Sequence, residues 1–433
     1  MQNRRIKEFF IAVVILLTFN NISFSQDTDA LGTFTPYSIF GLGDINKGGT
    51  AFNKAMGGTG IAIRENRLIN LVNPAAISYR DTLSFMLDFG VTQSGHYSKS
   101  DNKSSAYNVF NMHHVALTFP IYKKSAFVAG IMPYSNIGYK FETVETRPEI
   151  INELGYIRYQ KYGTGGITKS FMGASFVFLD KFSFGAEGIY YFGTIDKYSN
   201  ANFITNPNYR AINTGIDHTI SSFSGKLGLQ YSTKVKNDLD LTVGATWLIG
   251  SKLGGDFSRY SYAYGSRGNI DTVYSSTVNE TFLEIPNEYG IGFSLRKKDK
   301  WLITADYIRQ DWSDVDFLPT PGVDFRTAAS NSFRFGFEYI PNRYDVRYYS
   351  KRVSYRGGFY YDNSYMKVSG KQINAMGVTL GATLPIFRFY NGLGISLDMG
   401  QRGSMKNNLV RERYIMMNFS ISLHDIWFIK YKY

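Results

Sequence analysis

Long segments of this chain alternate between apolar residues and small or polar residues with a period of two. In residues 238–253, the apolar face carries Leu239, Leu241, Val243, Ala245, Trp247 and Ile249. Residues 281–296 and 373–386 repeat the pattern, with apolar faces formed by Leu283, Ile285, Tyr289, Ile291, Phe293 and Leu295 and by Met376, Val378, Leu380, Ala382 and Leu384. Because successive side chains of a strand point to opposite faces, this pattern predicts β-strands with one apolar face. A soluble β-sandwich and a membrane barrel would both show it.

The spacing of these segments separates the two alternatives. Fourteen strands are expected, at 83–97, 108–121, 125–143, 165–179, 181–197, 217–234, 238–253, 278–296, 299–313, 328–341, 350–362, 372–387, 389–403 and 409–425. Connections after even-numbered strands are short, apart from the longer 341–349, whereas those after odd-numbered strands are mostly long, as at 144–164, 198–216, 254–277 and 314–327. Short turns at one end, long loops at the other and an even strand number are typical of bacterial outer-membrane barrels. The sequence therefore predicts an all-β, 14-stranded antiparallel transmembrane β-barrel over residues 83–433.

Residues 1–25 have the features of a secretory signal peptide. A basic start precedes an apolar run over 9–19, and the small residues Ser23 and Ser25 place the expected cleavage before Gln26. The run is shorter than the roughly 20 residues that a transmembrane helix requires. An exported chain without such a helix can still span a membrane as a closed barrel, and we expect it in the outer membrane.

Residues 26–82 do not alternate and are rich in glycine and small residues. Fourteen strands enclose a bore that needs filling, so we expect this segment to form a hatch in the lumen. Its candidate packing residues are Gly57, Gly58, Gly60, Asn73, Pro74 and Ala75. The glycine run lacks the Lys-Ser/Thr pair that follows the glycines of a phosphate loop, which favours a packing turn.

Five charged residues are expected to face the lumen when the apolar faces point outward: Glu187, Asp306, Arg334, Glu338 and Arg356. A charge that faced lipid near the bilayer midplane would cost about 2–4 kcal/mol. We expect these residues to anchor the hatch by pairing with it or with one another. The alternative is that an arginine binds the carboxylate of a ligand.

Several classes of function receive no support from the sequence. The chain has no cysteine, which excludes a disulfide scaffold and a thiolate metal site. His113 and His114 are adjacent and are expected on opposite faces of a strand, so we predict no metal site and no cofactor. The basic residues behind the formal charge of +12 are scattered, which disfavours nucleic acid as a partner. No spacing of Ser, His and Asp indicates an enzyme.

Several motifs resemble the long-chain fatty acid transporter family of outer-membrane proteins. Residues 55–62 with Asn73-Pro74-Ala75 are similar to that family's N-terminal hatch, and 283–292 resemble its Leu-Pro strand opening. The segments Asp311-Trp312-Ser313, 333–339 and 356–360 resemble the strands that follow. Residues 36–44 and 425–428 resemble a divergent Bacteroidetes branch. The resemblance covers residues 36–433 at the level of architecture.

This resemblance implies a barrel closed by a hatch, with lateral exit of hydrophobic molecules where the third strand kinks. The corresponding strand here contains Pro133, and proline cannot donate to a strand ladder. The candidate lateral opening comprises Pro133, Tyr134, Ser135, Asn136 and Gly138. A simple bulge without a passage is the alternative.

Two functions remain open on this basis. The first is passive transport of hydrophobic or amphipathic small molecules, with an entrance formed by 144–164 and by 254–277, although the latter is more polar than such an entrance should be. The second is a non-transporting subunit or docking platform of an envelope machinery, for type IX secretion or barrel assembly, which binds surface lipoproteins through tyrosine-rich loops. A porin for polar solutes is disfavoured by the hatch. The expected partners are membrane lipids together with hydrophobic small molecules, or with lipoproteins and other envelope subunits.

Overall fold

The computed structural model describes residues 32–80, 84–101, 103–206, 208–236, 238–265, 269–279, 283–317, 323–386, 391–406 and 409–426. The predicted signal peptide lies outside the described residues, as do residues 427–433 at the chain end. None of the helices in the described part of the chain is long and apolar enough to cross a membrane.

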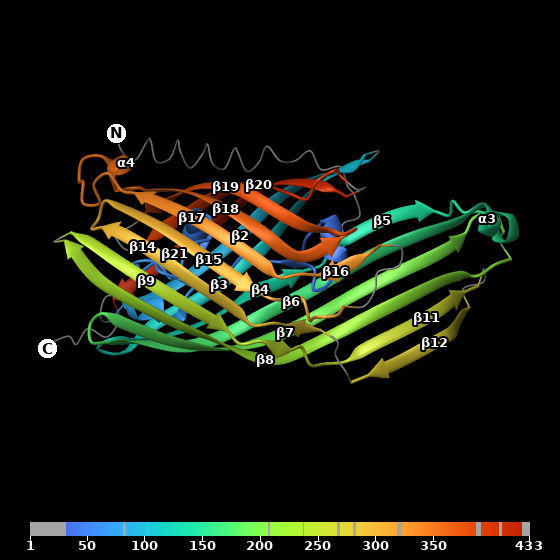
Figure 1. Cartoon of the computed structure of the whole chain (residues 1–433), viewed down its shortest axis with the longest axis horizontal. Helices are drawn as coiled ribbons and strands as arrows, with labels where there is room; N and C mark the ends of the chain where they lie inside the picture. The colour runs from blue at the N-terminus through green and yellow to red at the C-terminus, as the bar shows by residue number, and fades with distance from the viewer. Residues whose placement is uncertain are drawn as a thin grey trace. The chain divides into compact units, whose positions relative to one another are not determined.

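Fourteen antiparallel strands form a closed barrel (Figure 1). They are β2 (Ser84–Lys99), β3 (Ser104–Tyr122), β4 (Ser125–Asn136) continued by β5 (Tyr139–Val144), β6 (Ile157–Phe178), β7 (Phe182–Phe203), β8 (Ala211–Lys236), β9 (Leu239–Leu248), β14 (Glu288–Lys297), β15 (Trp301–Gln310), β17 (Ser330–Tyr339), β18 (Ser354–Val368), β19 (Lys371–Pro385), β20 (Gly392–Arg402) and β21 (Arg411–Ile426). The last strand pairs with the first over Ser84–Lys99 and Arg411–Ile426, which closes the sheet. The predicted fold class and strand number are confirmed.

The two faces of each strand differ as the alternation predicts. On β19, Leu380 is 51% exposed on the outside, whereas its neighbour Thr379 is 1% exposed and faces the lumen. The expectation was wrong for Leu283 and Ile285, which are buried. Pro286 and Asn287 interrupt the ladder, and the short strand β13 (Glu284–Ile285) pairs with β10 (Ser251–Lys252) instead of continuing the outer wall.

Six strands continue beyond the rest of the barrel at one end. β5, β6, β7 and β8 run on as an extended sheet, and a hairpin of β11 (Phe257–Tyr264) and β12 (Ile270–Val278) pairs with the start of β8. The helix α3 (Pro148–Leu154) joins β5 to β6 at this end (Figure 1). Most of the long connections expected at 144–164, 198–216 and 254–277 are therefore strand. Polar residues on both faces hide the alternation there, because an extension outside the membrane has water on either side.

Short connections lie at the opposite end, where α4 (Tyr349–Arg352) forms part of the link between β17 and β18 (Figure 1). Short turns of bacterial outer-membrane barrels face the periplasm, so the six-stranded extension is on the extracellular side.

Residues 32–80, called here the N-terminal segment, pack against the inner faces of the strands. They contain the 3₁₀-helices η1 (Pro36–Ile39) and η2 (Pro74–Ser78), the two-residue strand β1 (Asp44–Ile45) and the helix α2 (Ala51–Lys54). The main buried cluster mixes residues of this segment, such as Leu42 and Ile77, with inward-facing wall residues such as Ile167 and Ile189.

Candidate lateral opening and lumen contacts

Glycines bring the N-terminal segment into direct contact with the barrel wall. Gly57 has a positive φ of 69°, and a Cβ there would lie 2.6 Å from the carbonyl oxygen of Phe359. On the wall, a Cβ at Gly358 would lie 2.3 Å from the backbone nitrogen of Gly57. Backbone therefore packs on backbone here, which only residues without a Cβ permit. The glycine run is a packing turn against the wall.

Two of the predicted lumen charges bond to this same turn. The Asp306 carboxylate accepts hydrogen bonds from the backbone N–H groups of Gly60 (2.7 Å) and Ile61 (3.0 Å). The Arg334 guanidinium donates to the carbonyl oxygen of Gly58 (3.2 Å). Both wall side chains thus satisfy backbone groups of the N-terminal segment that would otherwise be buried without a partner.

The other three predicted lumen charges lie elsewhere. Arg356 and Glu338 form a buried ion pair at 2.7 Å, and Arg296 lies within 3.7 Å of Glu338 and within 3.1 Å of Glu65 in the N-terminal segment. Glu187 is buried on β7 and stands opposite Lys226 in the β7–β8 register. The structure thus does not bring all five together.

Asn73 makes the hydrogen bonds that hold the predicted Asn73-Pro74-Ala75 motif in place. Its side chain accepts from the backbone N–H of Ala75 at the start of η2 and donates to the carbonyl oxygen of Ile61 at 2.7 Å. Pro74 occupies the first turn of η2, where its missing N–H has no cost. The Asn-Pro-Ala motif therefore ties η2 to the glycine turn.

The wall loses its ladder between β3 and β4. Residues 115–122 of β3 pair with residues 125–131 of β4. Residues 104–114 of β3 have no pairing with β4 and pair with β2 alone. On the other side, β4 shifts register against β6 between Pro133 and Ser135. The proposed opening at Pro133–Asn136 and Gly138 coincides with this break in pairing.

The N-terminal segment occupies the break. β1 pairs with β4, with Asp44 opposite Asn136 and Ile45 opposite Ser135. Gly138 donates to the hydroxyl of Ser38 at 3.2 Å and accepts from the backbone N–H of Thr35 at 3.1 Å. On the β3 side, Phe34 stacks on Tyr107 with ring centroids 3.5 Å apart, and Asn111 donates to the carbonyl of Gly32. Residues 32–46 therefore take the place of the missing ladder.

The register of β1 on β4 predicts a specific crosslink. Ile45→Cys with Ser135→Cys should form a disulfide on mild oxidation, because directly opposed antiparallel residues have Cα separations within the disulfide range. Peptide mapping without reductant checks this in a chain that otherwise has no cysteine. Ile45→Cys with Asn152→Cys, on exposed α3, is the matched pair that should stay reduced. Equal crosslinking of the two pairs would contradict the register.

A bulge overturns the expected orientation of the two adjacent histidines. Gly90 pairs with His114 and Val91 with Met112, so His113 is an extra residue in β3. Both imidazoles therefore point inward, with their Nδ1 atoms 2.7 Å apart, and His114 also bonds to Asp88. Adjacent residues face opposite sides only in a regular strand, and the bulge at His113 breaks that regularity. No group of three or more His, Cys, Asp or Glu in the described ranges could hold a metal ion.

Residues that sequence reasoning did not single out line the lumen cavity. This cavity of about 280 Å³ is lined by both charged and apolar side chains, such as Lys54 and Leu71 of the N-terminal segment and Asp398 and Met416 of the wall. Lys47 lies 3.0 Å from Asp362, and Arg402 bridges Asp44 (2.6 Å) and Glu412 (2.8 Å). Asp362 is 315 residues from Lys47 and Asp44 is 358 residues from Arg402, so no local pattern could have paired them.

Solved structures with the same fold are outer-membrane channels. The Pseudomonas putida toluene transporter TodX matches with a TM-score of 0.60 and 15% identity, covering 89% of this chain and 100% of that one. The Ralstonia pickettii toluene transporter TbuX matches with a TM-score of 0.57 and 17% identity, covering 87% of this chain and 98% of that one. A Pseudomonas aeruginosa FadL homologue matches with a TM-score of 0.58 and 11% identity, covering 89% and 99%. At these identities the likeness shows the fold alone.

The family assignment comes from the sequence as a whole. No curated protein matches the chain. The model of the BamG family matches residues 5–433, which is nearly the entire length. The predicted resemblance to fatty acid transporters thus holds for the architecture, and the family that the sequence matches is BamG. The chain belongs to the BamG family and is a 14-stranded barrel of the bacterial outer membrane with a FadL-like fold.

Proposed function

We propose that this protein is a subunit of the machinery that assembles outer-membrane barrels, and that it serves as a docking barrel. The name of the matching family points to barrel assembly. The observation that carries the docking role is the extracellular sheet with the exposed edge strand β12. This proposal favours the second of the two functions considered from the sequence.

β12 offers a strand edge to a partner. Among the described residues it pairs with β11 alone, and eight of its nine residues are exposed. Ile270, Val273 and Tyr274 are 58%, 65% and 51% exposed. Natural edge strands are usually protected by lysine, proline or covering segments, and β12 contains neither lysine nor proline. Such an edge suits an added strand from another protein.

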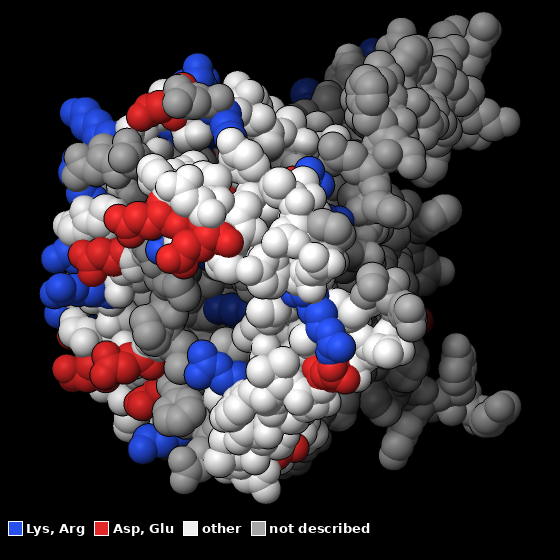
Figure 2. Space-filling model, turned by 90° about the vertical axis from the view of Figure 1, so that its right-hand side faces the viewer, with Lys and Arg blue, Asp and Glu red and all other residues white. Residues whose placement is uncertain are grey.

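The end of the molecule around this edge also suits a protein partner. Viewed from the extracellular end, basic and acidic side chains are interspersed along one margin and continue across the middle of the face, with uncharged stretches between them (Figure 2). Depletion of charge is a compositional feature of the centres of protein interfaces. Surface lipoproteins and other envelope subunits are the expected partners.

The lumen supports docking over transport. Passage of an apolar molecule past β1 would require breaking the backbone pairing of β1 with β4 and exposing the ion pairs of Lys47 and Arg402 to it. One specific observation favours transport, namely the break in the β3–β4 ladder at Pro133.

The first test is copurification from the outer membrane. Val273→Lys should reduce recovery of partner subunits by about tenfold, because a lysine on the edge opposes strand addition. Asn152→Lys is the matched control on α3, exposed at the same end but away from the sheet edge, and it should retain the partners. Equal recovery with both variants, or no assembly subunit with the wild-type protein, would refute the proposal.

The disulfide between positions 45 and 135 separates docking from transport. Locking β1 into the wall should leave partner recovery unchanged if the barrel docks. It should abolish uptake of a radiolabelled hydrophobic compound if the break is an exit. Loss of uptake on oxidation, restored by reductant, would support the transport function.

A further inference from the structure

A row of tyrosine rings lies on the outer face of the extracellular sheet, where β7, β8 and β11 run side by side (Figure 1). Tyr198 of β7 and Tyr260 of β11 both stand opposite Gly215 of β8. Their ring centroids are 6.4 Å apart, and Tyr262, two residues along the same face, has its centroid 5.0 Å from that of Tyr260. Because Gly215 has no side chain, the Tyr260 ring can lie over it, and the three rings form a continuous aromatic strip.

This aromatic strip lies beyond the membrane. Gly215 has the same parity on β8 as Phe223, whose side chain is 78% exposed on the outside of the barrel and contacts Tyr190. Exposed aromatic side chains of this kind are typical of the membrane interface. β8 begins at the extracellular end, so Gly215 precedes Phe223 by eight residues, or about 26 Å along the strand, in that direction. The strip therefore faces water above the lipid.

Two aspartates lie in the next position along the same strands. Asp196 of β7 and Asp217 of β8 stand directly opposite each other, and both are partly exposed. Like charges in this arrangement destabilise a pair of strands. Burial and the charge of Asp217 raise the pKa of the Asp196 carboxyl. No lysine or arginine of the described ranges forms an ion pair with either carboxylate, so the repulsion between them is not offset within this part of the chain.

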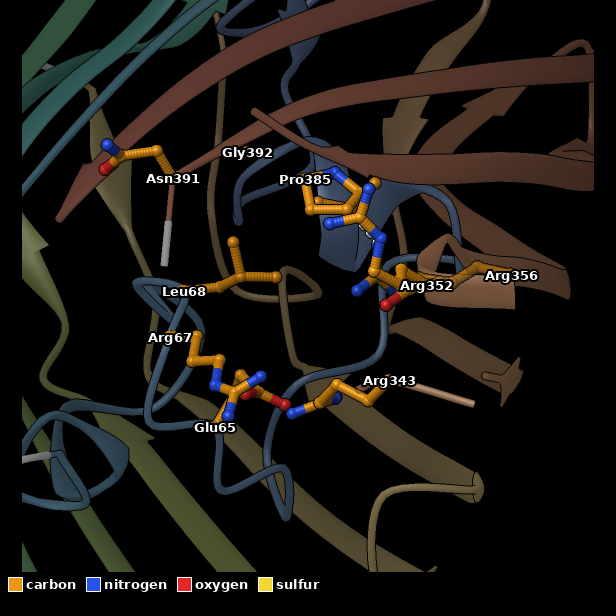
Figure 3. Close-up of a pocket in the computed structure, with 11 residues that line it drawn as sticks. Glu65, Arg67, Leu68, Arg343, Arg352, Arg356, Pro385, Asn391 and Gly392 are labelled. Atoms are coloured by element: carbon orange, nitrogen blue, oxygen red, sulfur yellow. Dashed lines mark hydrogen bonds between the residues drawn. The ribbon is translucent and has the colours of Figure 1, made fainter. Parts of the chain in front are cut away.

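Carboxylates elsewhere in the protein have arginines beside them. In the same extracellular sheet, the Glu142 carboxylate lies 2.9 Å from the Arg158 guanidinium. At the opposite end of the barrel, Figure 3 shows Arg67 and Arg343 reaching toward Glu65. The two opposed aspartates beside the aromatic strip differ from these in having acids and rings as neighbours but no cation.

We propose that this surface, formed by Asp196, Tyr198, Asp217, Tyr260 and Tyr262 and called here the tyrosine face, binds an arginine-bearing segment of the partner protein. The inference rests on the docking function proposed above and names the chemistry of the partner. A guanidinium stacks on tyrosine rings while its N–H groups donate to carboxylates. Its positive charge complements the two aspartates and removes their repulsion.

The same features favour arginine over other cations. Lysine offers a compact, strongly hydrated charge that cannot stack on a ring as a planar guanidinium does. A calcium ion takes about 6–8 oxygen ligands, which is more than two opposed carboxylates supply, and it would leave the rings unused. The tyrosine face also continues through the pairing of β11 with β12 to the free edge, so one protein can cover both surfaces.

Copurification from the outer membrane tests the inference with the natural partner. Asp196→Asn with Asp217→Asn removes both charges at nearly constant volume. It should lower partner recovery about tenfold or more, which is the loss expected when charge-assisted hydrogen bonds are removed. Glu153→Gln removes an exposed acid on α3 at the same end and should leave recovery unchanged. Equal recovery by the wild type and the double variant would overturn the inference while leaving the docking function, which Val273→Lys tests, in place.

Calorimetric titration of the full protein in a neutral detergent tests the tyrosine face without the partner. A tetra-arginine peptide should bind the wild type saturably and the double asparagine variant about tenfold more weakly, while Glu153→Gln should match the wild type. Tyr260→Leu should weaken binding of tetra-arginine more than that of tetra-lysine, because only the guanidinium stacks.

Three results of this titration would overturn the inference whatever the copurification gives. The first is no saturable binding of tetra-arginine by the wild type. The second is equal binding by the wild type and the double asparagine variant. The third is binding of calcium that depends on the two aspartates in a protein that does not bind the peptide, which would assign the carboxylates to a metal ion.

Discussion

Gly358→Ala is expected to displace the N-terminal segment from the barrel wall, whereas Gly357→Ala leaves it in place. A Cβ at position 358 would lie 2.3 Å from the nitrogen of Gly57 and 2.3 Å from the carbonyl carbon of Met56, both backbone atoms with little freedom to move. At position 357 the nearest atom is the carbonyl oxygen of Thr379 at 3.7 Å, an ordinary contact. Overpacking of this kind costs about 1–3 kcal/mol or more.

Hydrogen exchange of residues 50–63 measures the displacement. A loss of about 3 kcal/mol should speed exchange of these amides about a hundredfold in Gly358→Ala, while Gly357→Ala should match the wild type. A Cβ at position 358 would also lie 2.8 Å from the carbonyl oxygen of Phe335 on β17. The barrel itself should still stay closed in both variants, because the other residues of the β17–β18 ladder are unchanged. Equal exchange in the two variants would show that the glycine contact does not position the segment.

Asp306→Ala is expected to loosen the same turn by removing its acceptor. Two buried N–H groups, of Gly60 and Ile61, would lose a charged partner, and each unsatisfied buried donor costs about 1–3 kcal/mol. The expected loss of local stability is therefore about 2–6 kcal/mol. Asp311 follows the same strand, and its side chain is 57% exposed. Asp311→Ala should therefore change the local stability of the turn little.

Limited proteolysis in detergent checks this prediction. The Asp306→Ala protein should be cut within residues 50–70 under conditions in which the wild type and Asp311→Ala resist. Under the docking proposal, partner recovery should survive this change, because the extracellular edge lies at a distance from the glycine turn. The Thr379 hydroxyl also accepts a hydrogen bond from the backbone N–H of Gly57 at 2.8 Å. Resistance of the Asp306→Ala protein would mean that Arg334, Thr379 and the glycine contact hold the turn without the carboxylate.

Together, Gly358→Ala and Asp306→Ala test whether the N-terminal segment is a permanent part of the wall. Gly358 and Asp306 hold the glycine turn, while β1 replaces the missing ladder between β3 and β4. A segment released by either change while β1 remains paired would show two independent anchors. Release of both regions at once would show a single cooperative unit.

Local patterns in the sequence determined the strands, their lipid-facing sides and the inward position of Asp306 and Arg334. Alternation with a period of two is a property of a few consecutive residues, so it can be read without knowing what a strand pairs with. Glycines at 57 and 58 likewise indicated a tight turn. Alternation gave wrong predictions in three places. These are the bulge at His113, the interruption after Ile285, and the extension, which has water on both faces.

Only the tertiary structure decided what the segments do to one another. The pairing of Ile45 with Ser135 and the ion pair of Lys47 with Asp362 join residues that are far apart in the chain. Such contacts depend on the closure of the barrel and on the path of the N-terminal segment inside it. Neither of these produces a periodic pattern in the sequence. The candidate lateral opening could be located from Pro133, but that residues 32–46 occupy it follows from hydrogen bonds that exist only once the sheet has closed.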